Sequence, residues 1–110
     1  MTPRKTHPGR GGGDDSRMVV ALVQATLLVP GCRSLKEKRS VVKGLVETAR
    51  HRFHASVAEV GALDLLQRAE IGAALVANDA RLVTAEAEKL VAFLGRHPDA
   101  RLVDHQVEVL

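Results

Sequence analysis

Residues 18–39 read MVVALVQATLLVPGCRSLKEKR and contain the change of pattern that decides the fold. The segment 19–29 is nearly continuously apolar and rich in β-branched residues, which is typical of a central strand. A Pro-Gly pair ends this strand. Ser34 and, three residues later, Glu37 form a capping box, which marks the start of a helix. We therefore expect a strand followed directly by a helix.

The next segments continue with clear periodicities. Apolar residues recur at helical spacing from Leu35 to Phe53, which predicts a helix of about five turns. Residues 54–60 alternate between apolar and polar types and predict a short strand, whereas residues 69–77 predict a longer one. Together these two segments predict a hairpin with a wide connection.

A second helix and a last strand complete the chain. Either Asn78 or Asp79 can cap the helix, and residues 95–98, with their Gly and Pro, end it. Residues 101–110 alternate strictly, which predicts a strand with His105 on its helix-facing side. The predicted order of elements is β-α-β-β-α-β.

This order is the split βαβ pattern of ferredoxin-like folds. We therefore predict an α+β, ferredoxin-like domain in which a four-stranded antiparallel sheet carries two helices on one face. The other face should be open, polar and acidic. The outward strand residues assigned from the alternation are Gln24, Thr26, Glu59, Glu70, Asp104, Gln106 and Glu108.

The chain of 110 residues is long enough for one domain and too short for two. Residues 1–17 contain three consecutive glycines and few apolar side chains, which predicts a disordered tail. Met18 opens the first apolar segment, so we also consider that translation starts there. Residues 18–110 are predicted to form the single ferredoxin-like domain.

The composition argues against several functional classes. We expect no membrane partner, because no apolar run approaches the length that spans a bilayer. Cys32 is the single cysteine and the five histidines lack convergent ligand spacings, so we predict no disulfide, metal or catalytic thiol. The run Gly11–Gly13 lacks the Gly-Lys-Ser/Thr ending of a phosphate loop, and we predict no cofactor. A non-enzymatic cytoplasmic protein is the resulting expectation.

Cations gather unusually at the start of the first helix, although they oppose its dipole there. On a helical projection several of them form one stripe beside the apolar face, and such a stripe could follow a phosphate backbone. The alternative is that these side chains border the core and only keep the helix soluble. The candidate nucleic-acid contacts are Arg33, Lys36, Lys38, Arg39, Lys43 and Arg50.

Stacking of RNA bases on the sheet is not expected, because Phe53 and Phe93 are the sole aromatic residues and both fall at core positions of helices. A different hypothesis is that the open sheet face binds another protein, or that the sheet face or a strand edge forms a homodimer. The sequence leaves both hypotheses open.

The span from Met18 to Leu110 resembles the YlxP-like family, a bacterial domain of unknown function 503. The matching motifs are Pro30-Gly31, Ser34-Leu35-Lys36-Glu37-Lys38-Arg39, Arg52-Phe53, Ser56-Val57-Ala58-Glu59-Val60, Gln67-Arg68-Ala69, Ile71-Gly72, Asn78-Asp79 and Val107-Glu108-Val109-Leu110.

The resemblance implies a ferredoxin-like fold and a gene that in many bacteria lies among translation genes, which favours a role with ribosomal RNA or the small ribosomal subunit. It implies no catalytic residues. Family members often carry an aromatic residue where this chain has Leu66, so a stacking role of that loop is not expected here. Asp64, Gln67 and Arg68 remain candidates for a polar contact or for holding the hairpin connection together.

Overall fold

The computed structural model describes residues 17–110, so nearly all of the predicted tail lies outside the described residues. The domain boundary after residue 17 and the alternative start at Met18 therefore stay predictions. The elements are β1 (Val19–Leu28), α1 (Leu35–Phe53), β2 (Ser56–Gly61), β3 (Arg68–Ala77), α2 (Ala80–Gly95) and β4 (Arg101–Val109). The predicted order β-α-β-β-α-β is confirmed.

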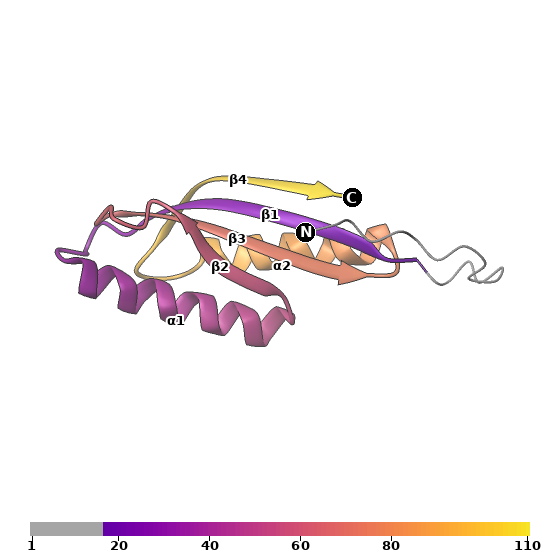
Figure 1. The fold of residues 1–110 in the computed structure, drawn as a ribbon, viewed down its shortest axis with the longest axis horizontal. Helices are drawn as coiled ribbons and strands as arrows, with labels where there is room; N and C mark the ends of the chain where they lie inside the picture. Colours follow the sequence, from indigo (N-terminus) through magenta and orange to yellow (C-terminus); the bar gives the residue numbers. More distant parts are fainter. Residues whose placement is uncertain (1–16) are drawn as a thin grey trace, which may run out of the picture.

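The four strands form one antiparallel sheet in the order β2-β3-β1-β4. Both helices lie on the same face of this sheet, with α1 nearest β2 and α2 beneath β1 and β4 (Figure 1). This is the predicted α+β, ferredoxin-like architecture, with one face open. Among residues 17–110, no helix combines the length and apolarity needed to cross a bilayer.

The core lies between the sheet and the helices. Alternate residues of β1 and β3 are buried, and they meet the buried sides of α1 and α2. These strand residues are mostly Ala and Val, so the helices can approach the sheet closely. Phe53 and Phe93 make an edge-to-face contact between the two helices with ring centroids 5.6 Å apart. The prediction that both aromatic residues serve the core is confirmed, although each is only partly buried.

Both helices begin at the predicted caps. The Ser34 hydroxyl accepts a hydrogen bond from the Glu37 amide at 3.1 Å, and the Glu37 carboxylate accepts one from the Arg33 amide at 2.8 Å. Ser34 is thus the predicted cap, whereas the Glu37 carboxylate bonds the amide one residue before Ser34 and not that of Ser34 itself, as a regular capping box would. At α2 the choice between two residues is resolved, since Asp79 accepts from the amide of Arg81 at 2.7 Å.

Two predictions about the strand faces were wrong. Glu59 was assigned to the open face, but it lies opposite the buried Ile71 and therefore faces the helices. The alternation of β4 was read as unbroken, but a β-bulge skips Val103, since Asp104 pairs with Thr26 and Leu102 pairs with Leu27. His105 lies on the helix-facing side as predicted, yet it stays exposed.

The open face is also less polar than predicted. Its β4 side carries Asp104, Gln106 and Glu108, but its centre and β2 side carry the exposed apolar residues Leu22, Val60 and Val76. The sheet face is therefore divided into a polar and an apolar part.

Candidate nucleic-acid interface

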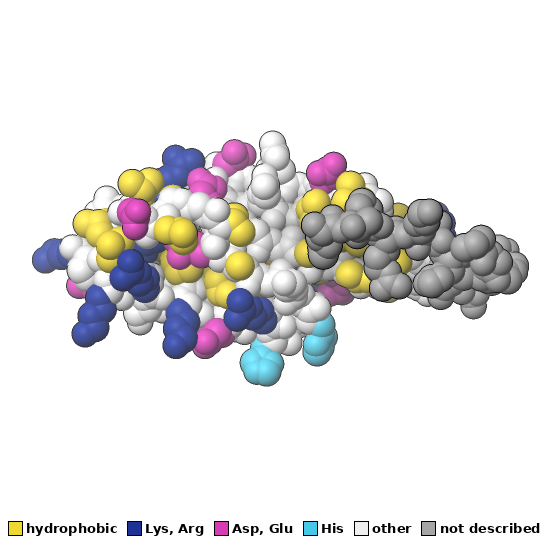
Figure 2. Space-filling view, viewed as in Figure 1, with side chains coloured by type: hydrophobic (Ala, Val, Ile, Leu, Met, Phe, Trp, Pro, Cys, Tyr) yellow, Lys and Arg dark blue, Asp and Glu magenta, His cyan; other side chains and the backbone are white. Residues whose placement is uncertain are grey.

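Helix α1 presents most of the predicted cations to solvent. Arg33 precedes the helix, Lys36, Arg39 and Lys43 follow along its first half, and Arg50 lies in its last turn; all five are exposed. Figure 2 shows Lys and Arg side chains gathered over α1, at the lower left of the view. The basic face of α1, meaning these five residues, is thus a real surface feature.

Three residues of the basic face line one shallow groove between α1 and β2. Arg39, Lys43 and Arg50 border this groove, whose volume is about 400 Å³, and Glu47 is the exposed carboxylate beside them. Within residues 17–110, none of the five cations forms an ion pair with a carboxylate. Their charge is therefore available to an anionic partner.

Arg50 also has a structural contact. Its Nε donates a hydrogen bond to the carbonyl oxygen of Val57 in β2 at 2.9 Å. The two terminal nitrogens of the guanidinium remain for another contact, since Arg carries five N–H donors.

Lys38 does not belong to the interface, which corrects the prediction. Its side chain is buried, with a relative exposure of 0%. The ammonium lies 2.9 Å from Glu59 Oε2 and donates to the carbonyl oxygen of Ala62 at 2.5 Å. It therefore cannot reach a phosphate of a bound nucleic acid.

The spacing of Lys38 could have revealed this. The residue precedes Val42 by four and Leu45 by seven, and both are buried. In a helix this spacing places Lys38 on the core-facing stripe. Its position is explained once Glu59 is known to face the helices, because a buried cation needs a partner.

The predicted polar cluster of the β2–β3 connection is split in two. Gln67 holds the loops together: its carbonyl oxygen accepts from the Val29 amide at 2.9 Å, and its side-chain nitrogen donates to the Pro30 carbonyl oxygen at 3.3 Å. Arg68 turns instead to Glu70, 2.8 Å away on the open face. Asp64 is exposed and joins neither contact. The reading of this segment as a structural connection fits Gln67.

The pKa of Glu70 is lowered by its contacts on the open sheet face. The Thr26 hydroxyl donates to its carboxylate at 2.8 Å, and the Arg68 guanidinium adds a second hydrogen bond and its charge. These contacts outweigh partial burial and lower the pKa of Glu70. Glu70 is thus held ionised near neutral pH.

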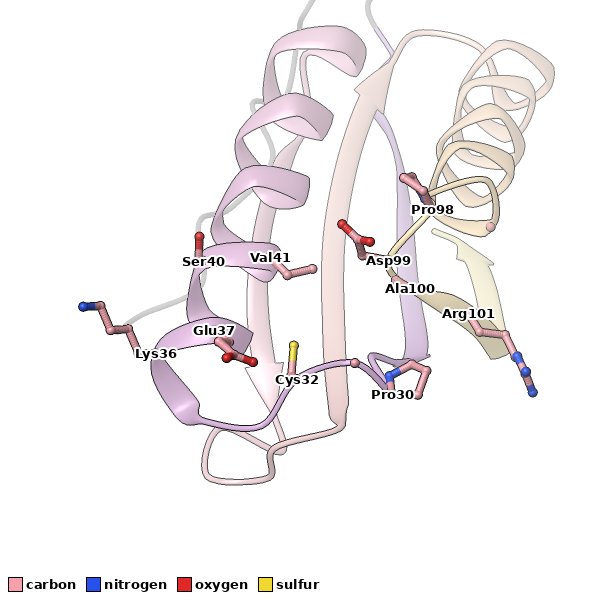
Figure 3. A pocket seen from close by; sticks show the side chains of 12 residues that line it. Pro30, Cys32, Lys36, Glu37, Ser40, Val41, Pro98, Asp99, Ala100 and Arg101 are labelled. Carbon is pink, nitrogen blue, oxygen red and sulfur yellow. The ribbon is translucent and has the colours of Figure 1, made fainter.

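A cavity with a volume of about 930 Å³ lies where the β1–α1 turn meets the loop before β4. Figure 3 shows Cys32 at its floor with the thiol directed toward Val41 and Asp99, while the charges of Glu37 and Lys36 lie at the helix start. Burial raises the pKa of the Cys32 thiol, and the carboxylates of Glu37 and Asp99 raise it further. The thiol is therefore a poor nucleophile, because the reactive form is the thiolate.

Residues 17–110 contain no group of three or more His, Cys, Asp or Glu side chains arranged to hold a metal ion. This part of the chain presents the basic face of α1 and an apolar strip on the open sheet face, formed by Leu22, Val60 and Val76. It also contains the cavity at Cys32, whose thiol pKa is raised.

The comparison with protein families decides the classification. The family described as Protein of unknown function (DUF503) matches residues 20–107. The chain belongs to this family.

A curated relative supports the same conclusion. The "Uncharacterized protein YlxP" of Bacillus subtilis (strain 168) is 27% identical over 81 residues, which cover 74% of this chain and 88% of the relative. Among solved structures, the "De novo designed protein Foldit4" is similar with a TM-score of 0.47 and 11% identity, covering 86% of this chain and 97% of the designed one. The family match and the Bacillus subtilis relative confirm the resemblance to the YlxP-like DUF503 family. Neither printed name of the similar proteins assigns a function.

Proposed function

We propose that this DUF503 protein is a cytoplasmic, non-enzymatic module that binds structured RNA, with ribosomal RNA of the small subunit as its expected partner. The observation that supports this proposal is the basic face of α1. Within the described residues 17–110, Arg33, Lys36, Arg39 and Lys43 are exposed without carboxylate partners, and Arg50 extends the same side of the helix along the groove beside β2.

The energetic argument concerns the cost of this arrangement. A cation in the first turn of a helix opposes its dipole and destabilises it by about 0.3–1 kcal/mol, and Lys36 lies in that turn. Glu37 offsets part of this cost through its contacts at the helix start. A phosphate backbone would compensate the remainder, because bound phosphates supply the negative charge that the helix start favours.

Contacts of this kind hold a nucleic acid without reading its sequence. Each neutralised phosphate releases counterions, so binding weakens as the salt concentration rises. With four cations engaged, the logarithm of the binding constant should fall with the logarithm of salt concentration at a slope of about −3.

The test is co-sedimentation of the purified protein with small ribosomal subunits across a salt series. The variant Lys36→Glu/Arg39→Glu/Lys43→Glu should lose binding by at least tenfold, with its circular dichroism and melting temperature unchanged. The control is Arg81→Glu/Lys89→Glu/Arg96→Glu, which changes the net charge by the same amount on exposed positions of α2 and its exit. Equal losses in both variants, or no binding of the wild type at low salt, would contradict the proposal.

A second candidate function is protein recognition through the open sheet face, which the apolar strip favours. Gly72 and Ala74 lack large side chains, and together with Leu22 and Val60 they line a shallow hollow of about 330 Å³. Binding there would tolerate salt and would weaken when Val60 is replaced by Asp. From the sequence alone, substitutions at Gln24, Thr26 and Gln106 are expected to weaken such binding. These residues lie toward the polar part of the same face.

A further inference from the structure

Strand β4 forms one margin of the sheet, and no element of residues 17–110 lies against its outer edge (Figure 1). It is nine residues long and contains neither Pro nor Lys, although Arg101, Asp104 and Glu108 carry charges. The bulge at Val103 protects its beginning, but residues 104–109 run in unbroken register with β1. This edge is therefore open to a further strand.

The side chains of β4 are also poorly covered. Val103 is 48% exposed and Val109 is 40% exposed, and Leu110, just beyond the strand, is 65% exposed. Such exposure at an open edge is typical of a surface that is covered in an assembly.

The backbone alternation shows which groups of β4 are available. The Leu110 amide donates to the Val20 carbonyl oxygen at 2.8 Å, and antiparallel ladders alternate between bonded and non-bonded pairs. Because Leu110 is bonded to β1, every second residue before it is bonded in the same way. The amides and carbonyls of residues 104, 106 and 108 therefore point toward β1. The amides and carbonyls of odd-numbered residues in 105–109 point away from the sheet.

The charges of β4 complement a second copy of the same strand. Arg101 lies near one end and Glu108 near the other, both on the open face. A two-fold axis at His105, with the bulge residue Val103 skipped in both copies as it is in the pairing with β1, places Arg101 of one copy beside Glu108 of the second copy, and symmetry repeats the pair. The same register places Leu102 beside Val107 on the helix-facing side. Parallel pairing would instead bring like charges together.

We propose that the protein forms a homodimer in which the outer edges of two β4 strands pair antiparallel around His105. The two four-stranded sheets then form one continuous sheet of eight strands, with the helices of both copies on one face. This inference stands apart from the proposed RNA binding, since it rests on β4 and not on α1.

The dimer has a consequence for the basic faces of α1. Each lies near β2, at the far margin of its own sheet. Seven strand spacings of about 4.8 Å separate the two β2 strands, so the two basic faces lie roughly 34 Å apart on the same side. One folded RNA could contact both, which would raise its avidity.

Sedimentation equilibrium and light scattering of the full chain across the micromolar range test the dimer. His105→Lys should weaken dimerisation at least tenfold, because two ammonium groups meet at the axis. The matched control is Gln106→Lys at the neighbouring exposed position. It should leave the dimer unchanged or tighten it, because in this register residue 106 lies opposite Asp104 of the second copy. Circular dichroism and the melting temperature verify that both variants fold.

A charge exchange tests the register. Arg101→Glu and Glu108→Arg should each weaken the dimer about tenfold, which corresponds to about 1.4 kcal/mol. The double variant should restore wild-type affinity, because the pair is re-formed with the charges exchanged. A merely structural role of these residues would not produce this restoration.

A dimer weakened by His105→Lys and restored by the charge exchange supports the proposal. A monomer at every concentration overturns it. A dimer that is insensitive to these changes but lost in Val60→Asp also overturns it, because the open face would then be the interface.

Discussion

The two edges of the sheet are built differently. At β2, which is six residues long, the outward carbonyl oxygen of Val57 accepts a hydrogen bond from Arg50 at 2.9 Å. Just past the strand, the carbonyl oxygen of Ala62 accepts one from Lys38 at 2.5 Å. At β4, which is nine residues long, no described side chain donates to or accepts from the outer edge. Within residues 17–110, one edge is closed by its own helix and the other has no such contact.

This difference follows from where the helices lie. Helix α1 packs beside β2, so long cationic side chains on that helix can reach the edge of the strand. Helix α2 packs beneath β1 and β4 and carries its charged residues on the solvent side. The comparison teaches that the cations of α1 serve two purposes: Lys38 and Arg50 close an edge, while Arg39 and Lys43 remain free for a partner.

Among changes that would abolish the difference between the two edges, the largest loss of stability is expected for Lys38. Lys38→Ala should lower the free energy of unfolding by about 3 kcal/mol, because it leaves Glu59 with a charge beside the core and no cation. Urea unfolding measures this change. The control is Lys36→Ala, an exposed neighbour whose replacement should change stability by less than about 0.5 kcal/mol.

The double variant Lys38→Met/Glu59→Leu separates charge from packing. It should be clearly more stable than Lys38→Ala, because replacing both members of a buried pair by apolar residues removes the uncompensated charge. Equal unfolding curves for Lys38→Ala and Lys36→Ala would show that the buried pair does not support the β2 edge.

A smaller effect is expected at Arg50. Arg50→Ala removes the hydrogen bond to Val57 and should reduce the free energy of unfolding by about 1 kcal/mol. It should also speed hydrogen exchange in β2 while leaving β4 unchanged. Lys43→Ala is the control, since Lys43 lines the same groove without a bond to the strand. Equal exchange rates in the two variants would show that the hydrogen bond from Arg50 does not stabilise the β2 edge.

The smallest effect is expected at the contact between Thr26 and Glu70, which lies on the two central strands of the sheet. The pKa of Glu70 is lowered in the folded protein, chiefly by the Thr26 hydroxyl. The ionised carboxylate therefore contributes stability that is fully present above the ordinary Glu pKa of 4.5 and is lost as pH falls through the lowered value.

Thr26→Val should raise the pKa of Glu70 and reduce the loss of stability on acidification. An NMR titration of Glu70 and urea unfolding at neutral and acidic pH measure the two quantities. Because Thr26 and Glu70 lie on the two central strands, the change should be alike at low and high protein concentration. A titration of Glu70 that stays unchanged in Thr26→Val would assign the lowered pKa to Arg68 instead.

Local signals in the sequence predicted most of the fold. The Ser34 cap, the apolar spacing to Phe53 and the cap of α2 all depend on residues within one or two turns. The first two were found where predicted, and of the two candidates for the third, Asn78 and Asp79, the structure has Asp79. Of the six candidate cations, five are exposed along or just before α1, and their contact with a nucleic acid stays a prediction. Lys38 was misassigned because it was grouped with the other cations by charge. Its spacing from Val42 and Leu45, which places it on the apolar side of the helix, was not considered.

Features that involve two strands were harder to predict. A strand has two faces, and a short alternating segment such as 56–61 fits the sheet in either orientation until its register with β3 is known. Glu59 was therefore placed on the wrong face. The bulge at Val103 was missed for the same reason, since it exists only relative to β1.

The sequence by itself determined the elements, their order and the concentration of cations at the start of α1, because spacing and capping act between near neighbours in the chain. Tertiary structure alone decided that Lys38 is buried against Glu59, that Arg50 closes the β2 edge and that β4 is left open. These outcomes depend on which strands become neighbours and which helix lies beside each edge, and distant parts of the chain meet only when the sheet forms.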